Sequence, residues 1–391
     1  MSVAARPPLG RCPVVRLRVL RVLSPLVREF VTAVRRTDRI DVVLVEATDA
    51  AGRTGWGEAA VSWRVTGESP ESVAAAVVGP LTEAVVGRDP GDAALPIALA
   101  GATWGNAAAR SAVECALADL AARQQGRRLA DVLFAASANA SSPDGAVSSD
   151  AAPPRIRTDM TLSAGTPAEL AATAAEHAAA GFHCLKVKAD ASMDLRAVLC
   201  AVSDAVGERV VLRVDANQAW EADAAIRSIR ACEDAGLAIE FVEQPVAAVD
   251  LAALARVTAA VDTPIMADES VRGIRDVRAV ADRGAADLVN IKLAKTGGLA
   301  EAQAAATAAV NAGLGVVFGC MMEAHVGLAA AAHLAAAVAP GVVHDLDAAL
   351  WHRTAPVVGG IQYRADTIEL GAGPGIGVTG LRSDALEEVL G

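Results

Sequence analysis

Short apolar runs that each end in an ionisable residue recur through the middle of the chain. Five of them end at Lys188 (CLKVK), Asp215 (VVLRVD), Glu243 (AIEFVE), Asp268 (PIMAD) and Lys292 (DLVNIK). Successive runs lie roughly 25 residues apart, the length of one strand, one helix and their loops. This pattern predicts a parallel (β/α) barrel, because there all strands end on one face and bring distant residues around one cavity.

The first unit of this barrel follows the same pattern. Arg157–Leu162 is predicted to be its first strand and Thr166–Ala180 its helix. Thr166 or Ser163 is available as the N-cap of that helix, and Gly181 as its stop.

The last units are shorter. Gly315–Phe318 is predicted to be the seventh strand and Val342–His344 the eighth. The Ala-rich run Val326–Val343 approaches the length of a membrane span, but His333 and Pro340 interrupt it. We therefore expect a packed barrel helix there.

The chain opens with a different pattern, typical of a small α+β domain. Val14–Leu23 and Ile40–Ala47 are predicted strands, and a turn at Asp49–Gly55 indicates an antiparallel hairpin. We expect Ser24–Arg39 to be a polar loop and Gly55–Glu68 to form a shaped surface rather than a core strand, so that both loops can cover something.

Helical spacing of Ala, Leu and Val follows at Pro70–Val86 and Asn106–Arg123. Ala135–Pro154 is small, polar and proline-bearing, as in a linker. The expected organisation is a capping domain over residues 1–134, a linker over 135–154, a barrel over 155–358, and a C-terminal segment over 359–391 that returns to the capping domain.

Composition narrows the function. The 391 residues are 53% hydrophobic and carry a net charge of −11, which opposes binding to nucleic acid or an anionic membrane. Six cysteines without CxxC pairs indicate reduced thiols rather than disulfides or a zinc site. Met1–Leu23 lacks the apolar core of a secretory signal, an Arg-rich transit peptide being a weaker alternative. We expect a cytoplasmic homo-oligomer that acts on a small molecule.

The five strand-end residues point to a metal site. A single acid after an apolar run is usually a loop residue or a helix cap. Three acids that converge with two lysines would repel one another strongly without a cation. A hard divalent metal resolves this conflict.

These residues stand in motifs that resemble a known family. The motifs are KVK at Lys186–Lys188, DANQ at Asp215–Gln218, VEQP at Val242–Pro245, ADES at Ala267–Ser270 and KLAKTGG at Lys292–Gly298. Together they resemble the muconate-lactonizing subgroup of the enolase superfamily. TDMTL from Thr158, CMME at Cys320–Glu323 and DLD at Asp345–Asp347 are similar to the dipeptide epimerases within it.

The resemblance implies a modified (β/α)7β barrel, a TIM-like α/β fold, under a capping domain built from both chain ends. It also implies one Mg²⁺ on Asp215, Glu243 and Asp268, with Lys188 and Lys292 as the acid/base pair. Lys186 would help to hold the substrate carboxylate, and Asn217 and Gln218 would orient the ligands.

The chemistry explains this set. Removing the proton α to a carboxylate makes an enediolate, which oxygen-bound Mg²⁺ stabilises. Two lysines on opposite faces of the substrate invert the α-carbon, for which the pKa of the neutral lysine must be lowered. Lys295 is expected to be a solvated helix-start residue.

The remaining expectations concern the substrate. Asp345 and Asp347 alternate at the end of the last strand, so both face the cavity or one points away; in dipeptide epimerases such a pair binds the free α-ammonium. Arg35, with Arg36 as the alternative, resembles the arginine that reads a glutamate side chain. Further substrate contacts are expected from Thr158 and Thr66.

We therefore expect epimerisation of L-Ala-D/L-Glu or a related dipeptide in peptidoglycan recycling. The family alternatives are a muconate-type cycloisomerase, an N-acylamino acid racemase and o-succinylbenzoate synthase. A non-catalytic binding protein on a retained barrel is the alternative of a different class. The sequence departs from familiar members at His325, at Trp63 and Arg64, and in the loop over 135–154.

Overall fold

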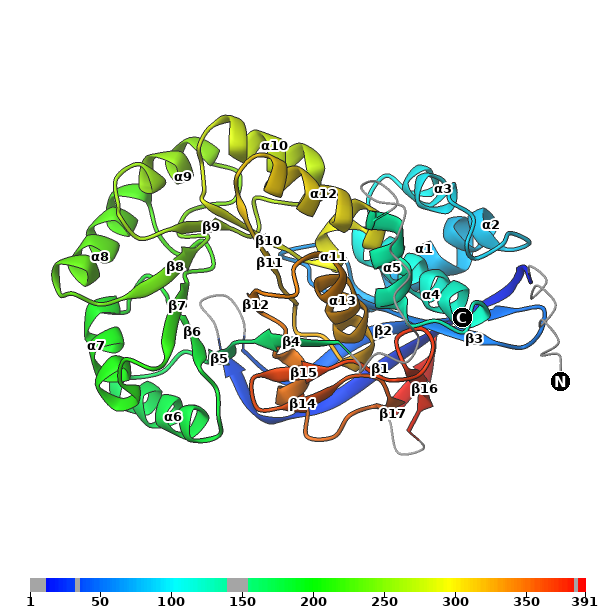
Figure 1. The fold of residues 1–391 in the computed structure, drawn as a ribbon, viewed down its shortest axis with the longest axis horizontal. Coiled ribbons are helices and arrows are strands. Elements are labelled where there is room, and N and C mark those ends of the chain that lie inside the picture. The colour runs from blue at the N-terminus through cyan, green and yellow to red at the C-terminus, as the bar shows by residue number, and fades with distance from the viewer. Residues whose placement is uncertain (1–11, 32–35, 139–153, 383–385) are drawn as a thin grey trace, which may run out of the picture.

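A computed structural model describes residues 12–31, 36–138, 154–382 and 386–391. Figure 1 shows two parts: a barrel of strands ringed by helices, and a capping domain beside it that holds the N-terminal strands and helices. A long blue hairpin runs from the capping domain to the edge of the barrel (Figure 1). There Val31 N donates to Ser163 Oγ at 2.7 Å, so the hairpin tip is tied to the barrel.

The barrel has the expected parallel topology. Seven strands pair in chain order, all parallel. They are β5 (Met160–Leu162), β6 (Cys184–Lys188), β7 (Val211–Asp215), β8 (Ile239–Glu243), β9 (Ile265–Ala267), β10 (Leu288–Ile291) and β11 (Gly315–Phe318).

The barrel closes through the predicted eighth strand. β12 (Val343–His344) pairs in parallel with β4 (Arg155–Thr158), and a bridge between Gly319 and Asp345 links it to the end of β11. The single first strand that we expected is broken at Asp159 into β4 and β5. Asp159 is buried there against Arg213, whose Nη1 donates to it at 2.7 Å.

Helices return the chain between the strands. They are α6 (Pro167–Ala179), α7 (Leu195–Val206), α8 (Ala222–Asp234), α9 (Leu251–Thr258), α10 (Ile274–Asp282), α11 (Leu293–Thr296), α12 (Leu299–Asn311) and α13 (His325–Val338). Thr166 caps α6 as predicted, and Gly181 follows it at a φ of +96°. The Ala-rich run is the buried helix α13, and no helix in the described part of the chain is long and apolar enough to cross a membrane.

The capping domain contains an antiparallel sheet in the order β17-β1-β2-β3, with helices α1–α5 beside it. Its strands are β1 (Val14–Val31), β2 (Arg36–Asp49), β3 (Thr54–Ala60) and the C-terminal β17 (Leu386–Val389). Its helices are α1 (Pro70–Ala76), a π-helical turn (Val77–Leu81), α2 (Thr82–Val85), α3 (Leu95–Ala102), α4 (Ala107–Gln124) and α5 (Leu129–Ala138). The predicted hairpin turn between β2 and β3 is confirmed.

The prediction of a loop at Ser24–Arg39 is wrong, because β1 and β2 extend through most of this range. Their pairing continues to Val31 opposite Arg36, with an irregularity between Pro25 and Phe30. The extension is stabilised by burial of Phe30, whose ring packs edge-on against Trp351 of the barrel at 4.8 Å between centroids.

The prediction of a shaped surface at Gly55–Glu68 is also wrong for the first part of that range, because β3 is a buried strand. Its glycines allow α4 to pack directly on the strand. A Cβ on Gly57 would lie 1.9 Å from Ala112 O, so no larger residue fits there. The glycines thus mark a close helix–strand contact inside the domain.

The C-terminal segment divides between both parts. β17 pairs with β1 in the capping sheet. β14 (Gln362–Arg364) and β15 (Thr367–Glu369) instead pair with each other and, through β15, with β4 of the barrel. β13 (Val357–Gly359) and β16 (Val378–Leu381) form a separate two-stranded sheet.

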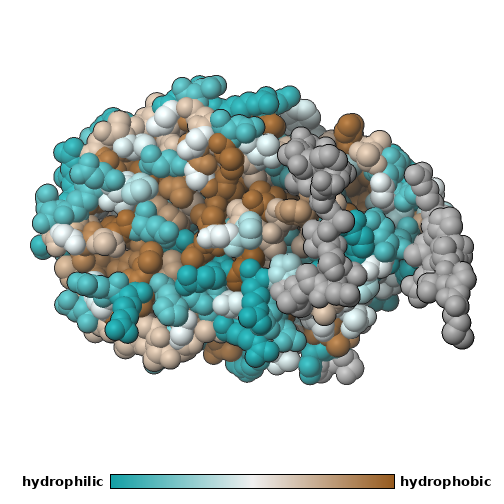
Figure 2. All heavy atoms as spheres, in the orientation of Figure 1, coloured by the Kyte–Doolittle hydropathy of each residue, from teal (hydrophilic) through white to brown (hydrophobic). Residues whose placement is uncertain are grey.

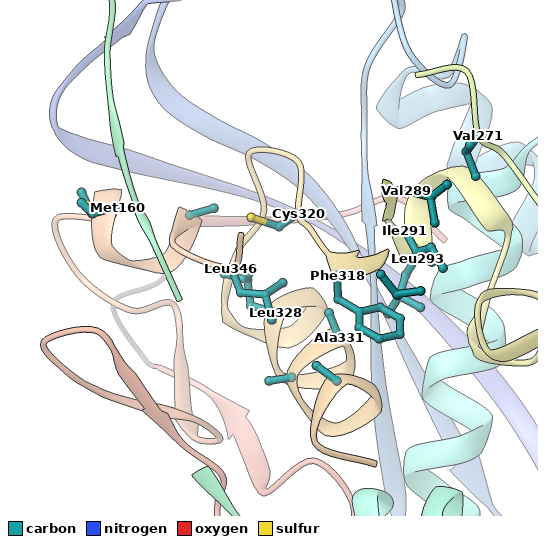
Figure 3. Packing of buried hydrophobic residues seen from close by; sticks show 14 of the residues in the cluster. Met160, Val271, Val289, Ile291, Leu293, Phe318, Cys320, Leu328, Ala331 and Leu346 are labelled. Atoms are coloured by element: carbon teal, nitrogen blue, oxygen red, sulfur yellow. The ribbon is translucent and has the colours of Figure 1, made fainter. Parts of the chain in front are cut away.

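One large apolar cluster fills the barrel and continues under the cap. In Figure 3 the Phe318 ring lies beside Ile291 and Leu293, and Leu346 lies beside Leu328 of α13. Figure 2 shows hydrophilic residues along much of the outer edge of the molecule. The capping domain is docked onto α13 by Glu58 of β3, which accepts from Gly327 N at 2.8 Å.

Candidate active site

The five strand-end residues come together at one end of the barrel. Lys188, Asp215 and Glu243 close β6, β7 and β8, while Asp268 and Lys292 directly follow β9 and β10. All five are buried. Lys188 is in register with Asp215, and Asp215 with Glu243, which places these side chains next to one another.

The two expected acid/base lysines belong to opposite sides of the barrel. In the sheet, β7, β8 and β9 lie between β6, which carries Lys188, and β10, which precedes Lys292. Both lysines line the same cavity. A substrate held between them would therefore meet one amine from each side.

Each of these lysines contacts one of the strand-end acids. Lys188 Nζ donates to Asp215 Oδ2 at 2.5 Å, and Lys292 Nζ to Asp268 Oδ2 at 2.8 Å. Lys186 is buried behind them, with its Nζ 2.6 Å from Glu243 Oε2 and 3.2 Å from Asp215 Oδ2.

Charge repulsion among the acids shows in their pKa values. Burial, with the negative charge of Asp215, raises the pKa of Glu243 to about 8. Burial also opposes ionisation of Asp215, but Lys188 and Lys186 outweigh it and lower its pKa to about 2. Three carboxylates thus compete for the positive charge of the lysines.

The acids around Lys292 act on its pKa. Burial lowers it, but the negative charges of Asp268 and Glu243 outweigh burial, so the pKa lies well above its ordinary value. The lowering that we expected depends on the positive charge of a nearby metal, so it stays a prediction.

The three acids have the chemistry of a divalent-metal site. Buried carboxylates on neighbouring strand ends are the oxygen donors that Mg²⁺ prefers, and a cation would relieve the repulsion that raises the pKa of Glu243. Among the described residues, one group of three potential metal ligands has its ligand atoms within 4.8 Å of one another: Cys320, Asp345 and Asp347. The oxygens of Asp215, Glu243 and Asp268 lie further apart than that. Asp215 and Asp268 each turn to a lysine instead, and metal binding would require these contacts to open.

Lys295 corrects another expectation, because it is buried rather than solvated. Its Nζ donates to both the carboxylate Oδ1 and the backbone carbonyl of Asp268, and to Asn290 O at 3.0 Å. Asp268 is therefore held between Lys292 on one oxygen and Lys295 on the other. No feature of the local sequence signals this burial.

The DANQ residues shape the loop after β7. Asn217 N donates to Asp215 Oδ1 at 2.9 Å, and Asn217 lines the cavity. Gln218 lies further back, where its Oε1 accepts from Ala248 N at 2.9 Å. Both residues have a positive φ, 45° and 68°, so hydrogen bonds hold this loop in an uncommon conformation.

Two polar residues near the acids were missed. Asn290, in the run LVNIK, donates through Nδ2 to Glu243 Oε1 at 2.8 Å. Gln244 accepts through Oε1 from Asp268 N at 2.9 Å and so fixes the backbone of that acid. Asn290 stands two residues before Lys292 and points to the same interior, so strand alternation was the available signal.

Asp345 and Asp347 both line the cavity, which decides between the two orientations left open by the sequence. Asp345 Oδ2 is 2.8 Å from Lys186 Nζ, so its charge is partly neutralised. Asp347 Oδ2 accepts from Thr161 N at 2.8 Å and Trp351 Nε1 at 3.3 Å, which are neutral donors. Asp347 is thus oriented without an ion pair of its own among the described residues.

The cavity has a volume of about 360 Å³ and lies between the barrel and the capping domain. Its barrel side carries the lysines and acids, together with Thr161 and Glu269, which the sequence reasoning missed. Its capping side is formed by Phe30 and by the segment Val61–Val65. Both capping segments that were expected to cover something therefore meet the site, the first of them as part of β1.

The other expected substrate contacts lie differently. Thr158 is fully buried and accepts through Oγ1 from Leu346 N at 2.9 Å, so it supports the DLD segment instead of lining the cavity. Thr66 donates through Oγ1 to Ser62 O at 3.1 Å and closes a turn. Arg36 is exposed and its Nη1 donates to Glu29 at 2.9 Å, whereas Arg35 lies outside the described residues.

Two family models match the two parts of the chain. Residues 15–133 match the N-terminal domain of the mandelate racemase / muconate lactonizing enzymes, and residues 169–383 match the enolase C-terminal domain-like family. The sequence is 38% identical to L-Ala-D/L-Glu epimerase of Bacillus subtilis over 371 residues, 94% of this chain and 97% of that protein. It is 34% identical to L-Lys-D/L-Arg epimerase of Methylococcus capsulatus, over 90% of this chain and 95% of that protein.

Solved structures give the same result. The substrate-liganded L-Ala-D/L-Glu epimerase of B. subtilis superposes with a TM-score of 0.87 at 37% identity, covering 95% of this chain and 99% of that one. The dipeptide epimerase of Enterococcus faecalis, complexed with Mg and L-Leu-L-Tyr, superposes with a TM-score of 0.85 at 32% identity, covering 94% and 99%. The fold, the motifs and these matches together establish that the chain belongs to the mandelate racemase / muconate lactonizing enzyme family of the enolase superfamily.

Proposed function

We propose that this protein is a Mg²⁺-dependent dipeptide epimerase that moves a proton off and back onto the α-carbon of the C-terminal residue. The substrate we propose is L-Ala-D/L-Glu or a closely related dipeptide. One observation carries the proposal: Lys188 and Lys292 line one cavity from opposite sides of the barrel, above three buried carboxylates.

The lysines supply the acid and the base. When one lysine removes the α-proton from its side, the other returns a proton from the opposite side, and the configuration of the carbon inverts. The two amines exchange roles for the reverse reaction. Asp215 and Asp268 contact Lys188 and Lys292 in this structure, and these contacts would open when the two acids hold the metal.

The metal would be held by Asp215, Glu243 and Asp268. A bound Mg²⁺ supplies positive charge that favours loss of a proton next to a carboxylate. Support for this assignment comes from the chemistry of the three buried acids and from the E. faecalis relative, which was crystallised with Mg. Lys186, between Glu243 and Asp345, would add positive charge where the substrate carboxylate lies.

The acidic pair at the end of the barrel selects a dipeptide with a free N-terminus. Asp345 and Asp347 together offer buried carboxylate oxygens to an α-ammonium, through charge-assisted hydrogen bonds. An N-acylated amino acid carries no such charge and would leave Asp347 facing a neutral group. This feature favours epimerisation of dipeptides over racemisation of N-acylamino acids.

The biological setting is also a proposal. An L-Ala-D/L-Glu dipeptide is a fragment of peptidoglycan peptides, so we propose a role in their recycling. The six cysteines are free and four of them are buried, which agrees with a reducing compartment such as the cytoplasm. We keep a homo-oligomer as the expected assembly.

Solvent deuterium tests the proposed reaction. The purified protein with Mg²⁺ is incubated in D₂O with a library of L-Ala-L-Xaa dipeptides, and mass spectrometry follows deuterium at the α-position of Xaa. We expect one deuterium per molecule together with formation of the L,D epimer. Absence of exchange across the library would exclude epimerase activity, and ring closure of a muconate without such exchange would favour a cycloisomerase.

A further inference from the structure

The charges around the cavity are distributed unevenly. On the barrel side, two lysines and four acids line it: Lys188, Lys292, Asp268, Glu269, Asp345 and Asp347. Directly behind them lie two more acids, Asp215 and Glu243, and two more lysines, Lys186 and Lys295. With all six acids ionised, a divalent cation would bring this group of six acids and four lysines to zero net charge.

An acidic side chain on the substrate therefore gains nothing from the barrel side. The substrate's own α-ammonium and α-carboxylate cancel one another there, so a second carboxylate would add uncompensated negative charge near four acids. It is favourable only if it points toward the capping side and meets a cation there.

The capping side offers such a cation in Arg64. Arg64 lines the cavity, is exposed, and forms no ion pair with a carboxylate of the described residues. It is the only cation that the capping domain's described residues contribute to the cavity lining. An arginine with an uncompensated guanidinium can hold a carboxylate through two parallel hydrogen bonds.

The loop that carries Arg64 is held over the barrel. Thr66 N and Gly67 N both donate to Ser62 O at 2.9 Å and close the loop into a turn. Arg272, at the end of the barrel, donates through Nη2 to Val65 O at 2.5 Å. The barrel thus fixes the backbone of the residue next to Arg64.

Several apolar side chains also line the cavity. They are those of Phe30, Val61, Val65, Met321 and Met322. They suit a side chain with methylene groups before its charged end, as in glutamate, and Met side chains adapt to its shape.

We propose that Arg64 is a specificity-determining residue that binds the side-chain carboxylate of an acidic C-terminal residue and discriminates against a cationic one. This inference rests on the proposed epimerase function and narrows its substrate class. It places recognition of the substrate side chain in the capping-domain segment Val61–Val65, beside Trp63 and Val65, rather than at Arg36, which is paired with Glu29.

The test compares substrates within each variant. The purified protein with Mg²⁺ is assayed on L-Ala-L-Glu, on L-Ala-L-Met of similar length, and on L-Ala-L-Lys. For wild type we expect the highest kcat/KM with L-Ala-L-Glu and the lowest with L-Ala-L-Lys. In Arg64→Met the ratio of kcat/KM for L-Ala-L-Glu over L-Ala-L-Met should fall by about tenfold or more, as expected for loss of a charge-assisted hydrogen bond at a partly exposed site.

Arg64→Lys and Arg36→Met are the matched controls. Arg64→Lys keeps the charge and should restore part of the ratio, and Arg36→Met should keep the wild-type ratio. An unchanged ratio in Arg64→Met, or a larger fall in Arg36→Met or Arg35→Met, overturns the inference. Wild-type preference for an apolar dipeptide overturns it too but leaves the epimerase function standing, whereas absence of any epimerisation defeats the function itself.

Discussion

We expect recognition of the substrate's ammonium to depend most on the carboxylate of Asp347. Its neighbour Asp345 shares its charge with Lys186 at 2.8 Å, whereas the hydrogen-bond donors of Asp347 are the neutral groups Thr161 N and Trp351 Nε1. Asp347→Asn removes one negative charge and keeps the side-chain volume. The amide oxygen can still accept from Thr161 N, so the local fold should be retained.

The expected cost follows from the burial of this group. A hydrogen bond to a charged group contributes about 1.5–3 kcal/mol, and Asp347 is buried and without an ion-pair partner among the described residues, which favours the upper half of that range. A loss of about 2–3 kcal/mol corresponds to roughly a 30- to 160-fold lower kcat/KM for L-Ala-L-Glu.

N-acetyl-L-Ala-L-Glu provides the control, because it has no ammonium to lose. The assay follows epimerisation of both substrates by polarimetry or NMR with both proteins, which makes a double-mutant cycle. Asp347→Asn should lower kcat/KM strongly for the free dipeptide and hardly at all for the acetylated one. Equal losses on both substrates would refute the reasoning and place Asp347 in the fold or the proton transfer.

Three predictions concern stability. Gly57→Ala should lower the free energy of unfolding, measured in urea, by about 3 kcal/mol, because its Cβ meets the backbone of α4. Gly101→Ala, in the open part of α3, should raise this free energy by about 0.5–1 kcal/mol. Similar effects of the two changes would contradict the close packing at Gly57. Lys295→Met should cost about 3 kcal/mol, since it leaves buried oxygens of Asp268 and its neighbours unpaired, and an unchanged urea midpoint would mean that Lys295 is solvated. Burial lowers the pKa of His333 to about 4, so the unfolded chain takes up a proton on this residue at a higher pH than the folded chain does. The free energy of unfolding should therefore fall as pH falls from about 6.5 toward 4, and it should fall less steeply in His333→Asn.

The strand-end residues were predictable because the barrel imposes a rule on the sequence. A parallel strand buried on both faces is a short apolar run, and its first polar residue marks the open end. Lys188, Asp215 and Glu243 end their strands in this way, and each lies where the pattern predicted. The resemblance then added roles that the pattern alone does not give.

Lys295 shows where this rule fails. It follows Lys292 within a helix of four residues, and nothing in its local sequence distinguishes a solvated lysine from a buried one. Its burial depends on Asp268, which follows β9, and on the backbone carbonyl of Asn290 within β10. Such partners become visible only when the strands are placed side by side.

The capping domain was less predictable for a similar reason. Ser24–Arg39 is polar and reads as a loop, but Phe30 finds its apolar partner Trp351 more than 300 residues away. The glycines of β3 look like loop residues until α4 is packed against them. In both cases contacts distant in sequence override the local preference.

The most direct test of the account follows the α-proton in the two single-lysine variants, Lys188→Met and Lys292→Met. Each purified variant, with its fold checked by circular dichroism, is incubated with Mg²⁺ in D₂O with L-Ala-L-Glu or L-Ala-D-Glu, and NMR records loss of the α-proton. The account predicts that neither variant interconverts the epimers, and that one variant exchanges the α-proton of one epimer only while the other variant exchanges that of the other. If both variants retain exchange with the same epimer, or if either still interconverts the epimers, the two lysines do not act from opposite sides.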